Sequence, residues 1–480
     1  MRGKIFITCL VLVLSSALYT MLLYKAEKTA DPVIVDKIQA ARLDGSLLAS
    51  AFPPSSAVWT RDNLSGLDQS IEAFYALMVL YKNMDNRLAR IINALNPGYY
   101  QAVDDEIPQM EEANLAAFAS KDQLADRSTW KIAYKPRFWH GVKAVLLFWY
   151  RDYHLSQLYW MIQISTFFAF ALFAAQVMYL DRQVGLAHSA FTFSAFFCSS
   201  VLFFGGVAYS VPLLSTALWG CLWLFFRMSR WRQNRNAELA LIVFGGTLLC
   251  FFFQLGGCEI YAFALVVFIE IFLPSQDDPR ATLRRALESC LFFLIGFFGS
   301  ILLKHLLIVC LSGSFDVVQE LIAKIAQRTG DTNEAGTKLG FLEVFLAQFH
   351  WYGVAAYGIA GLTAFVNFSL PLSLVVLAGI PLCCAVLRRT GKSQESEALL
   401  LGYAGYAMML ACVAGRYMLL RNHSDIHVFF VSRYLFVYAG TVYFFILWLL
   451  FFAVRLRSQV TYPAPNPSST KIRLTKIPSL

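Results

Sequence analysis

Arginine and histidine side chains gather in one late segment of the chain, between two long apolar runs. The cationic residues of this segment, 416–433, are Arg416, Arg421, His423, His427 and Arg433. Forked guanidinium groups and ring N–H groups suit a phosphate or pyrophosphate. The segment therefore predicts an anion-binding site.

Two other interpretations of this segment stay open. His423 and His427 are four residues apart, so on a helix they would share one face and could bind a metal. Asp425 is the nearest carboxylate, but it would point elsewhere on such a helix. Alternatively, the arginines anchor two helix ends at the membrane surface. We predict no cofactor and no metal site, and a divalent metal stays an open alternative.

A second cationic segment reads Arg137-Phe138-Trp139-His140-Gly141. Arg137 and His140 could donate to the same anion. The apolar run that follows, 144–150, is too short to span a membrane but rich in aromatic residues. We expect an interfacial helix there, lying on the membrane surface. A plain aromatic belt with a basic anchor is the alternative.

Candidate general bases come from the polar segment 25–157. A base that activates an acceptor hydroxyl must lie near the anion site and stay ionised beside its cations. Asp36 and Asp68 fit this requirement, with a capping or surface role as the alternative for each. Glu259, at a turn, and Glu270, in an apolar run, are further ionisable groups of the kind that membranes tolerate mainly for function.

The elements that must position these residues are membrane-spanning helices. Of 480 residues, 58% are hydrophobic and 15% charged, whereas soluble domains carry about 25% charged residues. About 20 apolar residues span a bilayer as a helix, and the lipid interior leaves the backbone few other options. We predict an all-α polytopic membrane protein with about 10–12 transmembrane helices. The apolar runs are Ile5–Tyr24, Leu158–Leu180, Phe191–Tyr209, Val211–Phe226, Leu239–Gln254, Glu259–Leu273, Cys290–Leu311, Phe345–Phe365, Leu370–Leu387, Leu399–Val413 and Tyr434–Val454.

Basic residues orient this topology. They cluster in short connections, such as Arg227–Arg235, Arg280–Arg285 and Arg388–Lys392, and such connections face the cytoplasm. The net charge of +9 is explained in this way without nucleic acid. Eleven runs are one too many or one too few, since an even number is needed to keep both ends of the chain inside. With both ends inside, the first loop and the loop at 416–433 share the outer face.

The predicted organisation has six parts. They are a first transmembrane helix at 1–24, an extracytoplasmic helical loop with the interfacial helix at 25–157, a transmembrane core at 158–311, a second polar, extracytoplasmic segment at 312–344, transmembrane helices with the outer Arg/His loop at 345–457, and a disordered cytoplasmic tail at 458–480.

This arrangement resembles the GT-C class of membrane glycosyltransferases. More narrowly, 137–141 and 422–433 look like two motifs, R-Y-W-H-G-Y and N-H-S-x-x-H-x-F-x-x-R, of a family of bacterial polytopic proteins. Leu67-Asp68-Gln69-Ser70 is similar to a third motif, L-D-N-F-T-D. The final acid of that motif is absent here, and Glu72 stands nearby.

The resemblance implies an enzyme of the bacterial inner (plasma) membrane with its active face outside the cytoplasm. It would move a sugar from a polyprenyl-phosphate-linked donor to a cell-envelope glycan or lipid acceptor. Asp36 or Asp68 would be the base, and the seven cationic residues named above would hold the phosphate. A polysaccharide polymerase or ligase and a transporter or flippase of lipid-linked saccharides are the alternatives.

Overall fold

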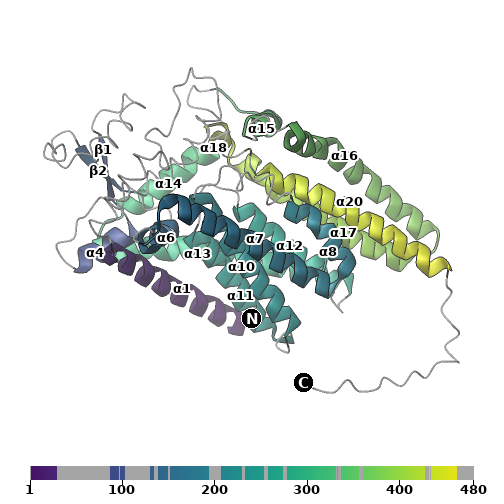
Figure 1. Ribbon diagram of the computed structural model, residues 1–480, viewed down its shortest axis with the longest axis horizontal. Helices are drawn as coiled ribbons and strands as arrows, with labels where there is room; N and C mark the ends of the chain where they lie inside the picture. Colours follow the sequence, from purple (N-terminus) through teal and green to yellow (C-terminus); the bar gives the residue numbers. More distant parts are fainter. Residues whose placement is uncertain are drawn as a thin grey trace.

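The long helices of the protein lie side by side along its longest dimension in the computed structural model (Figure 1). The structure describes residues 2–29, 87–96, 98–102, 130–134, 139–149, 152–193, 207–229, 233–252, 258–273, 278–330, 332, 337–355, 360–426, 432 and 434–461. Seven described helices are long and apolar enough to cross a membrane. They are α1 (Arg2–Thr29), α7 (Leu155–Leu180), α10 (Val207–Met228), α13 (Pro279–Ser312), α16 (Ala360–Arg389), α17 (Ser393–Leu419) and α20 (Leu435–Thr461). The protein is thus an all-α polytopic membrane protein, as predicted.

Two shorter helices, α11 (Arg235–Phe251) and α12 (Cys258–Ile271), fill the centre of this bundle. Twelve of the fourteen residues of α12 are buried, and the helix packs against α10, α13 and α17. A helix that is apolar on every side is stable only when other elements surround it. The centre of the bundle is therefore protein-lined rather than lipid-lined at α12.

Glycines set the closest helix crossing in the bundle, between α11 and α13. A Cβ atom added to Gly246 would lie 2.2 Å from the carbonyl oxygen of Phe293, and one added to Gly296 would lie 2.3 Å from that of Val243. Small residues let two backbones approach where lipid gives helices no hydrophobic reason to associate. This contact fixes α11 against the longest helix of the protein.

The bundle has two polar ends. We call them the network end, where Glu238 and Glu270 lie, and the site end, where Arg416 and Glu259 lie. At the network end, α1, α11 and α13 begin while α10 and α12 finish; at the site end, α12 and α20 begin while α17 finishes. α7 and α10 both finish at the network end, and α8 (Arg182–Phe193) follows α7 and packs back along it. α20 also finishes at the network end, where Arg455 pairs with Asp181 at 3.1 Å. Because α1 begins and α20 finishes at the same end, the chain crosses the bundle an even number of times.

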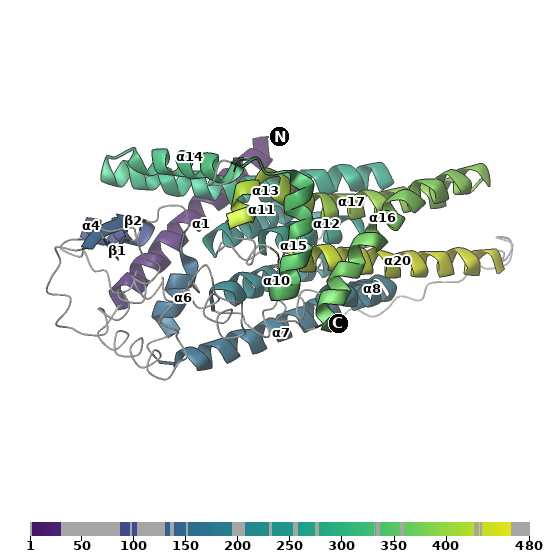
Figure 2. The ribbon, with the colours of Figure 1, turned by 90° about the horizontal axis from the view of Figure 1, so that it is seen from above.

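One expected crossing is absent among the described helices, which removes the conflict in the count. α15 (Phe341–Ala355) is seen nearly end-on in Figure 1 and lies across the long helices in Figure 2. Its fifteen residues extend about 22 Å, less than the roughly 30 Å of a hydrocarbon core. The apolar run Phe345–Phe365 is therefore a transverse helix followed by α16, and not a crossing. When this run is not counted as a crossing, ten of the eleven expected crossings remain, which is an even number.

The described parts of the first loop lie at the site end (Figure 1). They are α4 (Arg87–Leu95), an antiparallel pair of strands, β1 (Gly98–Ala102) and β2 (Trp130–Tyr134), and α6 (Gly141–Trp149). The strand pair adds a short extended element to a loop that was expected to be helical in parts. Aromatic and β-branched residues in both strands, such as Tyr99 and Ile132, favour this conformation.

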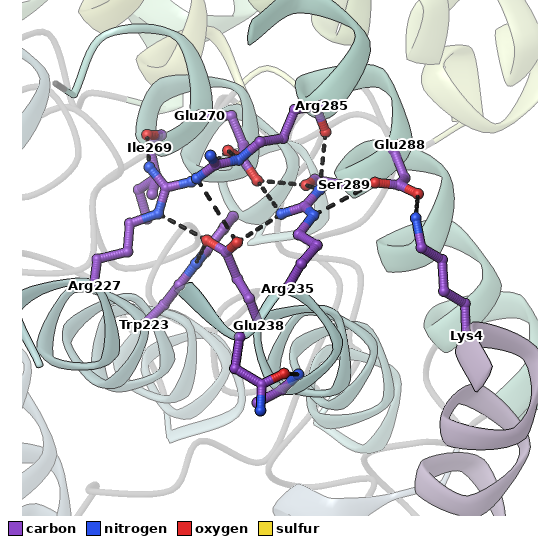
Figure 3. A network of polar contacts seen from close by, with 12 residues as sticks. Lys4, Trp223, Arg227, Arg235, Glu238, Ile269, Glu270, Arg285, Glu288 and Ser289 are labelled. Atoms are coloured by element: carbon purple, nitrogen blue, oxygen red, sulfur yellow. Dashed lines mark hydrogen bonds and ion pairs between the residues drawn. The ribbon is translucent and has the colours of Figure 1, made fainter. Parts of the chain in front are cut away.

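A network of ion pairs holds the network end together (Figure 3). Its centre is two carboxylates, Glu238 and Glu270, each 1% exposed. Arg227 Nε donates to Glu238 Oε1 at 2.8 Å, and Arg235 Nη1 donates to Glu238 Oε2 at 2.7 Å. Arg235 Nη1 also reaches Glu270 at 3.1 Å, and Arg285 Nε donates to Glu270 at 3.0 Å. Four helices, α10 to α13, are thereby joined at one point.

The same network reaches the first helix. Arg235 Nη2 donates to Ser289 Oγ at 2.8 Å and to Glu288 Oε2 at 3.2 Å. The other oxygen of Glu288 accepts from Lys4 Nζ of α1 (Figure 3). α1 also packs along α11 and α13. The first helix is therefore an integral part of the bundle.

All four oxygens of Glu238 and Glu270 accept hydrogen bonds. Burial alone would raise the pKa of Glu238, but Arg227 and then Arg235 reverse this and hold the pKa at about 2. Because this pKa lies below the usual value of about 4.3, the stabilisation is present above that pH and is lost as the pH falls toward 2. Glu238 is thus ionised at neutral pH.

We expect Glu270→Gln to destabilise the protein strongly, because it leaves buried arginines without their counter-charge. Removing one partner of a buried ion pair typically costs about 3–5 kcal/mol. Thermal unfolding in detergent measures the effect. Glu397→Gln, at an exposed position near the start of α17, is the matched control and should change stability by less than about 0.5 kcal/mol. Equal melting temperatures for the two variants would contradict a structural role for the network.

Candidate functional site

Four of the nine predicted site residues belong to the described part of the chain. His140, Arg416 and Arg421 are described with their side chains, and His423 by its backbone alone. The five that lie outside the described residues are Asp36, Asp68, Arg137, His427 and Arg433. The structure thus positions part of each cationic segment, and the two candidate bases stay predictions.

Arg416 lies in the last turn of α17, and the short helix α18 (Arg421–Ile426) follows directly. The sequence analysis had placed Arg416 in a loop. The helix continues past the expected boundary because Val413 and Tyr417, both fully buried, extend its packed face by another turn. The expected loop 416–433 is therefore helical in its first part.

The guanidinium of Arg416 is held on several sides. Nη1 donates to Ser424 Oγ of α18 at 3.1 Å, and Nη2 donates to the hydroxyl of Tyr434 at 3.3 Å. The Tyr434 ring also lies under the guanidinium, 4.2 Å from ring centroid to Cζ. Such stacking favours arginine over lysine at this position. The Arg416 side chain is only 7% exposed.

The counter-charge of Arg416 is Glu259, in the first turn of α12. Arg416 Nε lies 3.6 Å from Glu259 Oε1, which is an ion-pair distance longer than a hydrogen bond. The sequence indicates Glu259 as an ionisable group at a turn but not which residue it pairs with. Its position beside a Gly-Gly pair at the start of a central helix was the available signal. The pairing itself joins residues 157 positions apart, which spacing along the chain does not reveal.

Arg421 and its neighbour Asn422 tie α18 to the polar segment before it. Arg421 Nη1 donates to the carbonyl of Leu339 at 3.1 Å, and Asn422 Nδ2 donates to that of Gln327 at 2.8 Å. Gln327 belongs to α14 (Asp316–Thr329). Both residues of the N-H-S motif that are described with their side chains, Asn422 and Ser424, thus hold neighbouring elements in place.

His140 adopts a backbone conformation that side chains rarely take. Its φ is 57°, and it is the only non-glycine residue with a positive φ in the described part of the chain. The side chain is 2% exposed. Left-handed backbone costs a non-glycine residue about 1–2 kcal/mol, and such strain concentrates at functional sites. This observation marks His140 as a candidate independently of its sequence motif.

The residues on either side of His140 explain the rest of the W-H-G motif. Trp139 is fully buried, and its Nε1 donates to Ser300 Oγ of α13 at 3.0 Å. A Cβ atom on Gly141 would lie 2.6 Å from the Phe251 ring, so only glycine fits. α6 starts here and packs against α1 and α10 with six of its nine residues buried. The apolar face of this helix therefore meets protein, and its position at the membrane surface stays a prediction.

The two cationic segments lie at the same end of the bundle but in different hydrophobic clusters. Arg416 borders the larger cluster through Tyr417 and Tyr434, whereas Trp139 belongs to the second cluster. α14 links the two, because Val317 belongs to the second cluster and Gln327 binds Asn422. One end of the fold carries both segments.

The chemistry available at this end is electrostatic. A buried guanidinium with a displaceable carboxylate partner can stabilise a developing phosphate charge. In the described part of the chain, no group of three or more His, Cys, Asp or Glu residues is arranged to hold a metal ion. No protein-family model, curated protein or solved structure matches the chain. The function must therefore be argued from the site.

The strained conformation of His140 gives a direct stability test. His140→Ala and His140→Gly both remove the imidazole, but only glycine adopts a positive φ without cost. We expect His140→Gly to be more stable than His140→Ala by about 1 kcal/mol. Thermal unfolding of the two purified variants decides this. An alanine variant at least as stable as the glycine variant would argue against the left-handed conformation.

Proposed function

We propose that the protein is a membrane glycosyltransferase that moves a sugar from a polyprenyl-phosphate-linked donor to a cell-envelope glycan or lipid acceptor. The supporting observation is the buried Arg416 at the end of the bundle where the described parts of the first loop also lie. A carboxylate of that loop that positions the acceptor and a phosphate-binding arginine are useful to each other only on one side of the membrane.

In this proposal the site end faces away from the cytoplasm of a bacterial inner membrane. The basic connections lie at the network end, as the positive-inside rule requires for the cytoplasmic side. Arg416, Arg421 and the histidines of the same segment would bind the phosphate, with Arg137 and His140 approaching from α6. Asp36 or Asp68 would serve the acceptor.

Reconstitution tests the proposal. Purified protein in proteoliposomes is given polyprenyl-phosphate sugars and an acceptor glycan, and sugar transfer is followed by mass spectrometry. We expect transfer by the wild type, and a loss of about 100-fold or more for His427→Ala and for Asp36→Asn or Asp68→Asn. Asp152→Asn, exposed before α7, is the control and should keep full activity.

Full turnover by all three site variants would contradict the assigned site. A ladder of products rather than single transfer would indicate a polymerase. Movement of the intact lipid-linked sugar between leaflets, without transfer, would indicate a transporter.

A further inference from the structure

We propose that Glu259 is the carboxylate that accepts the proton of the acceptor hydroxyl. When the donor binds, its phosphate replaces Glu259 as the partner of Arg416. This inference rests on the proposed function. It differs from the sequence prediction, which looked for the base in the first loop, since Glu259 begins a central helix of the bundle.

The first argument is a comparison of the carboxylates inside this fold. At Glu238 and Glu270, every oxygen accepts a hydrogen bond. At Glu259, the buried Oε2 atom accepts none from the described residues, Oε1 meets Arg416 Nε at 3.6 Å, and the Tyr434 hydroxyl also lies beside the carboxylate. A buried polar atom without a partner is destabilising, so it needs an explanation. The network end is built for stability, whereas Glu259 keeps binding capacity in reserve.

Further buried polar atoms that form no hydrogen bond with the described residues occur on Arg416 itself and on a helix that contacts its neighbour Ser424. Arg416 Nε is buried and forms no hydrogen bond with the described residues, and neither does Oε1 of Gln348 from α15. Gln348 is 1% exposed, and its Nε2 lies 3.5 Å from the carbonyl of Ser424, whose Oγ binds Arg416. Arg416 Nε thus offers one cationic donor, and Glu259 Oε2 and Gln348 Oε1 offer two acceptors. A ligand with a phosphate oxygen and free hydroxyl groups matches this set.

Glu259 is more accessible than the two carboxylates at the centre of the network. The Glu259 side chain is 22% exposed, whereas the side chains of Glu238 and Glu270, at the centre of the network, are 2% and 0% exposed. Arg416, by contrast, is fixed by Ser424 and Tyr434, so it keeps its position if it loses Glu259. An exchange of partners therefore requires little movement: the guanidinium stays and the anion beside it changes.

The reaction balances without a redox partner. The acceptor oxygen forms a bond to the anomeric carbon as the bond between that carbon and the phosphate oxygen breaks. The electron pair of the broken bond stays on the phosphate, whose charge Arg416 stabilises, and the acceptor proton passes to Glu259. Release of that proton to water restores the carboxylate and its pairing with Arg416.

Kinetics of Glu259→Gln test the base. The amide is nearly the same size but cannot accept the proton, so kcat should fall by about 10²–10⁴-fold, while KM for the donor should fall rather than rise, because the donor phosphate no longer competes with Glu259 for Arg416. The acidic limb of the pH profile of kcat/KM should disappear. The charged and titratable groups beside Glu259 are Arg416, Tyr417, Tyr434 and Cys258. Glu259→Asp, which keeps a carboxylate, should retain the acidic limb and intermediate activity.

Binding supplies a readout that does not require turnover. With polyprenyl phosphate as the probe, titration by native mass spectrometry should show about 3–10-fold tighter binding to Glu259→Gln, because the phosphate no longer competes with Glu259 for Arg416. A carboxylate that merely anchors Arg416 would give the reverse. Unchanged or weaker binding by a folded Glu259→Gln protein would overturn the partner exchange.

The outcomes separate the two proposals. Wild-type transfer with full kcat and an intact acidic limb in Glu259→Gln would overturn the role of Glu259 and leave the proposed function standing. Absence of transfer by the wild type would remove both the function and the base. If Glu259→Gln fails to fold, Glu259→Asp decides: loss of the acidic limb while the carboxylate is present would overturn the proposal.

Discussion

The buried pairing of Glu238 and Glu270 with three arginines is the interaction on which the arrangement of the helices depends. It fixes the finish of α10 and α12 and the start of α11 and α13 at one level of the bundle (Figure 3). Charges placed this deep are tolerated only when all are paired. The helices can therefore assemble in one register, and that register also determines where the opposite ends lie.

The position of Glu259 at the opposite end of the bundle follows from this constraint. α12 carries Glu270 at one end and Glu259 at the other, eleven residues or about 16 Å away. Holding Glu270 in the network therefore sets the depth at which Glu259 meets Arg416. The two ends use the same chemistry differently: the carboxylates of the network are saturated with hydrogen bonds, while Glu259 is not. A rigid, fully paired end supports an end whose ion pair can change partners.

The sequence predicted the class of the fold and most of its helices because long apolar runs in lipid have few alternatives to the helix. It did not reveal the transverse α15, because an apolar run reads the same whether it crosses the bundle or lies over its end. Arg227, Arg235 and Arg285 looked like ordinary basic connections. Only folding brings them to Glu270, since these contacts join helices distant in sequence.

The central claim is that the first loop and the Arg416 segment share one face of the membrane. In a variant without native cysteines, single cysteines replace Asp104 in the first loop, Thr329 at the end of α14 and Thr390 between α16 and α17. A membrane-impermeant maleimide is applied to sealed vesicles of each orientation. We predict that positions 104 and 329 are labelled from one face and position 390 from the other. Labelling of positions 104 and 329 from opposite faces would contradict the claim.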